Sequence, residues 1–236
     1  MDRPGIDQHA ERVCLQRIAR ARELEPTNEE WARAQALALF KQISLGPLGY
    51  EPIQPRTENW REILLDCAQT DPENALYDYI EAGELWRNSV HYDWNDSLQR
   101  TEFIVVNEDV FKKSMDALSA GLKKPMLAFG KSEYAASLRF ARTTSLSELD
   151  AQEIAFLRTT DNHKSFRLAQ AIYRHRWLWN RAINHQDLTS VEPTYRQMLR
   201  VGEQLHAGDN EFHLQSSHRW FLYLAHIEFC RVIRQH

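Results

Sequence analysis

Signals for the start of a helix recur along this chain. In Thr27-Asn28-Glu29-Glu30 the threonine hydroxyl can accept the backbone N–H three residues on, and Glu30 can reach back to the threonine N–H. The same capping box occurs at Ser145–Glu148 and at Thr189–Glu192, and Asp71-Pro72 places an acceptor at the N-cap and proline at the first helical position. Leu, Ala, Glu, Gln and Arg, which favour helix, dominate the periodic stretches. The sequence therefore predicts an all-α fold of antiparallel helical hairpins.

The expected helices cover most of the chain. They lie at 7–24, 28–45, 58–69, 72–88, 108–122, 131–142, 146–159, 162–185, 190–206 and 210–235. Phe103-Ile104-Val105-Val106 is strand-like, but a lone strand builds no sheet, so we expect a loop or a helix entry there. We predict a single all-helical domain over 1–236, in which an N-terminal hairpin at 1–45 is followed by a loop rich in Pro and Gly at 46–56. That loop is either a packed connection or the rim of a binding cleft.

The charge balance and the cysteine pattern argue against several classes of protein. The net charge is −4 with both signs interspersed, whereas a nucleic-acid binder usually has a basic excess. The first residues lack the apolar stretch of a signal peptide, and no segment approaches the roughly 20 apolar residues that span a bilayer. Cys14, Cys67 and Cys230 stand far apart, which indicates a reducing cytoplasm and thiols buried as small apolar groups. We therefore expect a cytoplasmic protein that binds neither nucleic acid nor membrane.

The triplet His-Arg-Trp occurs at His175 and again at His218, inside two long segments rich in apolar and aromatic residues. At about 100° per residue, each segment carries apolar residues on two opposite faces of a helix. In 162–185 one face holds Leu168, Ile172, His175, Trp179 and Ile183, and the opposite face holds Phe166, Tyr173 and Trp177. Such a helix is layered between neighbours, or it uses its second face to bind something. We interpret the triplet as the mark of two packed helices.

The second face of 162–185 is the candidate binding surface. Its aromatic residues are Phe166, Tyr173 and Trp177, and a row of arginines at seven-residue spacing lies on one flank, at Arg167, Arg174 and Arg181. Two interpretations stay open, because the face either binds a ligand or packs inside the fold. The arginine row beside Trp177 could also hold phosphate or stack a nucleic-acid base, although a solvated flank of the helix explains it more simply.

Four residues after the Asp71-Pro72 signal have a characteristic spacing. Tyr79, Ala82, Gly83 and Trp86 are an aromatic, a small residue, a glycine and an aromatic at one helix's relative positions 4, 7, 8 and 11. This junction resembles the tetratricopeptide repeat (TPR), over about thirty residues at 60–88, and the repeat period does not recur elsewhere. The resemblance implies that Gly83 lets a partner helix approach closely. It implies a TPR-like array of helical hairpins, with an irregular layered bundle as the alternative, and a surface for a peptide.

The sequence lacks the common motifs of catalysis and metal binding. It contains no H-E-x-x-H, no G-x-S-x-G and no Gly-rich phosphate loop. Glu203 and His206 form one Glu-x-x-His pair on a helical face, whereas di-iron bundles need two such pairs on different helices. We therefore expect no catalytic residue, no metal and no cofactor. The favoured function is a non-enzymatic helical scaffold that binds a protein or peptide. The alternative is a helical enzyme or small-ligand-binding protein with an interhelical pocket.

Overall fold

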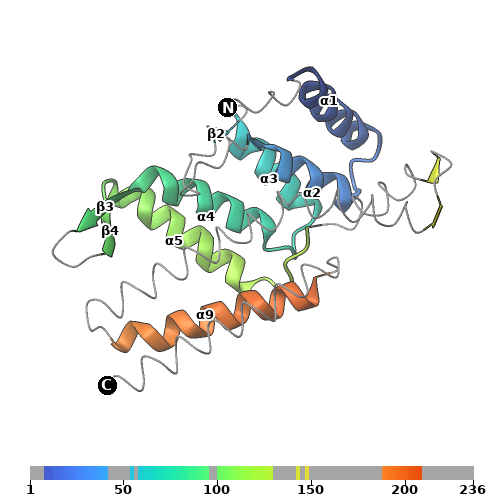
Figure 1. Cartoon of the computed structure of the whole chain (residues 1–236). Coiled ribbons are helices and arrows are strands. Elements are labelled where there is room, and N and C mark those ends of the chain that lie inside the picture. Colours follow the sequence, from blue (N-terminus) through green and yellow to red (C-terminus); the bar gives the residue numbers. More distant parts are fainter. Residues whose placement is uncertain are drawn as a thin grey trace. The chain divides into compact units, whose positions relative to one another are not determined.

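Helices dominate the computed structural model of the chain (Figure 1). The structure describes residues 8–41, 54–55, 58–95, 100–129, 142–143, 147–148 and 188–208. The helices in these residues are α1 (Gln8–Leu24), α2 (Glu29–Ala38), α3 (Trp60–Thr70), α4 (Leu76–Ser89), α5 (Glu108–Lys123) and α9 (Leu188–Ala207). The strands are β1 (Phe40–Lys41), β2 (Gln54–Pro55), β3 (Val90–Asn95) and β4 (Arg100–Val105). The described strands form only two-stranded sheets, so the predicted all-α class is confirmed.

The observed helix boundaries agree with those expected from the sequence for four helices and differ for α2 and α4. α1, α3, α5 and α9 begin and end within two residues of the expected positions. α2 ends at Ala38, well before 45, because the chain continues into β1, which pairs with β2. α4 begins at Leu76 instead of 72, since the side chain of Asn74 accepts the Leu76 N–H at 3.1 Å. Apart from 142–143 and 147–148, the expected helices at 131–142, 146–159, 162–185 and 210–235 lie outside the described residues.

The chain divides into two compact units, residues 1–72 and 73–236. The first unit holds α1, α2 and α3. Its core is made of small or medium-sized buried side chains from α2 and α3, namely Ala32, Ala36, Leu64 and Cys67. The predicted loop at 46–56 falls within this unit, and only β2 of it is described. The prediction of a single domain stays a prediction.

In the second unit α4 and α5 pack side by side (Figure 1). The hydroxyl of Ser114 on α5 donates to the carbonyl of Ala82 on α4 at 2.7 Å. Further along the pair, the rings of Trp86 and Phe111 meet with their centroids 5.4 Å apart. Buried aromatic area of this kind contributes strongly to packing energy. The helix pair therefore combines close backbone approach at small residues with a large aromatic contact.

A β-hairpin connects α4 to α5. β3 and β4 pair in antiparallel register, with Val90 opposite Val105 and His91 opposite Ile104. The expectation of a loop or helix entry at Phe103–Val106 was wrong. This run is not a lone strand, because Val90–Asn95 directly after α4 alternates apolar and polar residues, which is the pattern of a half-buried strand. The two runs supply each other's backbone hydrogen bonds.

The segment Lys124–Phe129, which we call the strap, follows α5 and bonds to two elements. The carbonyl of Met126 accepts the N–H of Ala75, and the carbonyl of Ala128 accepts a hydrogen bond from Asn74 Nδ2. Both partners lie just before α4. Leu127, between Met126 and Ala128, donates its N–H to the carbonyl of Gln204 on α9 at 2.8 Å. Alternate residues of an extended segment point in opposite directions. The strap therefore joins α4 and α9 through its backbone.

Candidate functional site

The predicted binding surface lies outside the described residues. This applies to all six of its members, Phe166, Arg167, Tyr173, Arg174, Trp177 and Arg181, and to both His-Arg-Trp triplets. Their role as a binding surface stays a prediction. The described residues form other clusters that qualify as candidate sites, namely buried polar groups in each unit and an exposed apolar strip on the β-hairpin.

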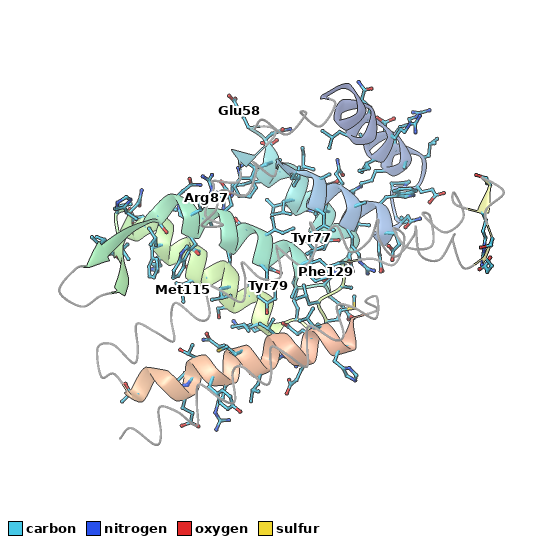
Figure 2. All side chains as sticks on the ribbon, viewed as in Figure 1. Glu58, Tyr77, Tyr79, Arg87, Met115 and Phe129 are labelled. Atoms are coloured by element: carbon cyan, nitrogen blue, oxygen red, sulfur yellow. The ribbon has the colours of Figure 1, made fainter. Side chains whose placement is uncertain are left out.

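A buried polar cluster surrounds Gln204 of α9, whose side chain is inaccessible to solvent. Tyr79, which Figure 2 labels on α4, donates its hydroxyl hydrogen to Gln204 Oε1 at 2.5 Å. Gln204 Nε2 donates to the backbone carbonyls of Gly121 and Lys124 at 2.7 and 2.6 Å. These carbonyls belong to the end of α5, where a helix leaves its last four carbonyls without helical partners. A side chain of α9 thus caps α5.

Arg200, one helical turn before Gln204, extends this cap. Its Nε donates to the carbonyl of Leu122 at 3.2 Å and its Nη2 to the carbonyl of Lys124 at 3.0 Å. A cation at the C-terminal end of a helix also interacts favourably with the helix dipole. Lys124 Nζ in turn lies 2.7 Å from the carboxylate of Asp78 on α4. The charges of this cluster are therefore used to join α4, α5 and α9.

The Tyr79 hydroxyl has an altered acidity in this environment. Burial raises its pKa well above the ordinary 10.0, and the carboxylate of Asp78 acts in the same direction. At neutral pH the phenol therefore keeps its proton and serves as a hydrogen-bond donor. A general base or nucleophile needs a pKa close to the working pH, so this environment does not prepare Tyr79 for catalysis.

Arg22 of α1 forms the centre of a polar cluster in the first unit. Its guanidinium donates to Asp66 at 2.7 Å and to Cys67 Sγ at 2.8 Å. Burial raises the pKa of the Cys67 thiol to about 11, although the positive charge of Arg22 acts to lower it. Because the thiolate is the reactive form, this raised pKa disfavours reaction of the thiol at neutral pH. Cys67 is buried, as predicted, but it contacts a charged group as well as apolar ones.

Arg33 of α2 forms a second ion cluster in the same unit. It is almost fully buried, and its Nε and Nη2 each lie 2.7 Å from a carboxylate, that of Asp71 and that of Glu29. Asp71 was expected to cap the next helix, but α4 begins at Leu76 with Ala75 as its N-cap residue, and the side chain of Asp71 pairs with Arg33. A buried carboxylate is stable only with such a partner. The pair ties α2 to the end of α3.

The Glu-x-x-His pair of α9 does not form part of a metal centre in the described residues. Glu203 lies 3.1 Å from the guanidinium of Arg200, and His206 is exposed. Among the residues that the structure describes, no group of three or more His, Cys, Asp or Glu side chains could hold a metal ion.

Two large apolar side chains are exposed together where the β-hairpin meets α5. Ile104 is 51% exposed and Val106 is 63% exposed. Ile104 lies near the end of β4 and Val106 directly follows this strand, and His91, also exposed, is opposite Ile104. We call Ile104, Val106 and His91 the hairpin strip. The backbone is fixed here, because the Val106 N–H donates to the carbonyl of Ser89 at 2.8 Å and Asn107 caps α5.

Sequence reasoning missed these clusters for different reasons. Arg33 and Asp71 are 38 positions apart and Tyr79 and Gln204 are 125 apart, so no local pattern indicates either pair. The hairpin strip did have a local signal in the strand-like run at 103–106. Its partner strand was missed because no element was expected at 90–95, between the helices at 72–88 and 108–122.

Comparison with protein-family models, with curated proteins and with solved structures gives no match to this chain. No helix in the described part of the chain is long and apolar enough to cross a membrane. The candidate site therefore rests on the geometry of the described residues and on the sequence.

Proposed function

We propose that this protein is a non-enzymatic helical scaffold that binds another protein or a peptide through the hairpin strip. The observation that carries the proposal is the joint exposure of Ile104 and Val106. Their backbone is fixed by the hydrogen bond from Val106 to Ser89 and by the Asn107 cap of α5. Full burial of such a side chain stabilises a complex by about 1.5–3 kcal/mol. A surface that is already ordered also loses little conformational entropy on binding.

The acidity of the buried groups supports a scaffold over an enzyme. Tyr79 and Cys67 both have raised pKa values and stay protonated at neutral pH. Arg22 and Arg33 are paired with carboxylates inside the first unit. Groups engaged in this way position helices, whereas an active site needs groups that converge on a substrate.

The partner class follows from charge and polarity. The hairpin strip offers apolar side chains, and the chain has a net charge of −4. A nucleic-acid surface needs basic groups that neutralise phosphates. We therefore propose a protein or peptide partner, and a cytoplasmic location on the evidence of three widely separated cysteines.

The aromatic face predicted from the sequence is a second part of the proposal. Phe166, Tyr173 and Trp177, with the arginine row Arg167, Arg174 and Arg181, would supply the large aromatic and guanidinium anchors that dominate protein interfaces. The variant Trp177→Ala tests this surface separately from the hairpin strip.

We also propose a TPR-like packing around α4. Support comes from the burial of Tyr79, Ala82, Gly83 and Trp86, the four residues that carry the resemblance. Trp86 contacts Phe111 of the next helix, as a wedging aromatic would. The β-hairpin between α4 and α5 departs from the family, which joins its helices with a short turn.

Quantitative affinity purification of the full chain from its own cells tests the function. The variant carries Ile104→Ser and Val106→Ser, and its control carries Leu65→Ser, which removes another apolar side chain that is 58% exposed but lies on α3. We expect a defined protein in near-equimolar amount with the wild type and the control. The double variant should recover about tenfold less of this protein, or even less, since interface anchors contribute over 1 kcal/mol each.

Two results would contradict the proposal. One is equal recovery of the same proteins by the wild type and the double variant. The other is the absence of any protein recovered in near-equimolar amount. If Trp177→Ala reduces the recovery of the partner and the double variant does not, the partner binds the aromatic face and not the hairpin strip. Circular dichroism of each variant confirms that the helical content is retained.

A further inference from the structure

The β-hairpin has a buried face and an outer face at the end that adjoins α4. Val90, the first residue of β3, is 7% exposed, whereas the next residue, His91, is exposed. Ile104, which is opposite His91, is exposed as well. Successive residues of a strand lie on opposite faces of a sheet. The outer face of the hairpin therefore begins with the His91–Ile104 pair of the hairpin strip.

The register of the two strands continues this outer face away from the hairpin strip. Asp93 is opposite Glu102, two residues beyond the His91–Ile104 pair, and Asn95 is opposite Arg100 two residues further on. The other face carries the pairs Val90–Val105, Tyr92–Phe103 and Trp94–Thr101. Two acidic residues are thus directly opposite each other on the outer face, next to the exposed apolar residue Ile104.

The Asp93–Glu102 pair is an unfavourable choice for the hairpin itself. Like charges directly opposite each other on adjacent strands repel and destabilise the sheet. Arg100 supplies one positive charge on the same face, against the two negative charges of the pair. A cation that binds both carboxylates at once turns the repulsion into attraction, and the planar fork of an arginine is suited to such contacts. The pair therefore favours a partner with a basic group.

We propose that the partner of the hairpin strip presents an extended basic segment, in which an apolar residue covers Ile104 and an arginine binds at the Asp93–Glu102 pair. This inference rests on the proposed function of the strip and adds the chemistry of the partner. The two contacts are one alternate position apart along the hairpin, which is about 7 Å. An extended segment with arginine two positions from an apolar residue has the same spacing.

Removal of one acidic charge separates a binding role from a structural one. The variant is Glu102→Gln in the full chain, used in affinity purification from its own cells. Because the repulsion with Asp93 is lost, its melting temperature by circular dichroism should equal or exceed that of the wild type. Recovery of the partner should fall about fivefold or more. The control is Asp116→Asn at an exposed position of α5, which changes the net charge equally and should leave recovery unchanged.

The outcomes distinguish this inference from the proposed function. If Glu102→Gln recovers as much partner as the wild type, while the variant with Ile104→Ser and Val106→Ser recovers less, the inference is wrong and the proposed function stands. A lower melting temperature of Glu102→Gln would also overturn the inference, because the carboxylate would then serve the fold. If the wild type recovers no protein in near-equimolar amount, the proposed function fails, and this inference fails with it.

Discussion

Gly121 marks the closest approach between α5 and α4. A Cβ atom built at this position would lie 2.8 Å from Tyr79 Cε1 and 3.1 Å from the Cβ of Asp78. The Tyr79 ring cannot easily move away, because its hydroxyl is bonded to Gln204. Glycine is therefore required here by space, although alanine is the better helix former.

We predict that Gly121→Ala destabilises the protein by about 1–3 kcal/mol, the usual cost of overpacking a close contact. Urea denaturation followed by circular dichroism measures the change. The control is Ser119→Ala on the exposed side of α5, which should be neutral or slightly stabilising. An equal or increased stability of Gly121→Ala would show that the contact between α4 and α5 is looser than described.

The start of α2 gives a second test at a single side chain. The sequence pattern allows Thr27 as the cap, but in the structure Asn28 Oδ1 accepts the N–H of Glu30 at 3.0 Å. Asn28→Ala should therefore cost about 1 kcal/mol. Thr27→Ala, at an exposed site, should stay within about 0.5 kcal/mol. If thermal or urea denaturation shows a larger loss of stability for Thr27→Ala than for Asn28→Ala, Thr27 is the cap, as the capping-box pattern in the sequence predicts.

The raised pKa of the Cys67 thiol predicts a loss of stability at high pH. Its pKa is raised from 9.0 to about 11 on folding, so below pH 9 the thiol is protonated in both states and its contribution is constant. Between pH 9 and 11 the unfolded chain releases this proton and the folded chain retains it, which lowers the stability. The slope from this one group reaches at most about 1.4 kcal/mol per pH unit.

Comparison of the wild type with Cys67→Ala isolates this effect, since other groups such as Tyr79 titrate in both proteins. The free energy of unfolding, measured from pH 7 to 11, should fall more steeply above pH 9 in the wild type than in the variant. Parallel curves would mean that the folded thiol titrates at its ordinary pKa. Reaction of Cys67 with a thiol reagent at pH 7 should accordingly be slow until the chain unfolds.

Between helices, the contact of α2 with the end of α3 depends on the buried Arg33–Asp71 pair. Removal of one partner leaves the other charge buried, so Arg33→Met alone should cost about 3–5 kcal/mol. The double variant with Arg33→Met and Asp71→Asn should be more stable than the sum of the two single changes predicts. A double-mutant cycle by urea denaturation measures this coupling. Strictly additive costs would indicate that the two side chains act independently.

The elements could be predicted where local signals decide them. α1 and α5 are amphipathic and contain no proline, and their boundaries were found within two residues. The end of α2 was missed because β1 pairs with β2, and that pairing joins residues 13 and 15 positions apart. The β-hairpin was missed because each strand is stable only with the other, so neither run is decisive when considered by itself.

Across the chain as a whole, the polar clusters that join the helices within each unit could not be predicted. Gln204 has no distinguishing neighbours in the sequence, and its role follows from the positions of Tyr79 and the end of α5 in space. Arg22 and Arg33 lie in ordinary helical patterns, and their ion pairs likewise depend on positions in space that the sequence does not show. The predicted surface around Trp177 lies outside the described residues. The hairpin strip depends on the exposure of two side chains, which sequence alone does not give.

Site-specific photo-crosslinking tests partner binding at the hairpin strip most directly. A photoreactive amino acid replaces Ile104 in the full chain inside its own cells, and a second chain carries it at Leu65 as the control. The account predicts a crosslinked product of one defined mass from position 104, containing a second protein, and none of that mass from position 65. No intermolecular product at 104, or the same products at both positions, would contradict the proposed function.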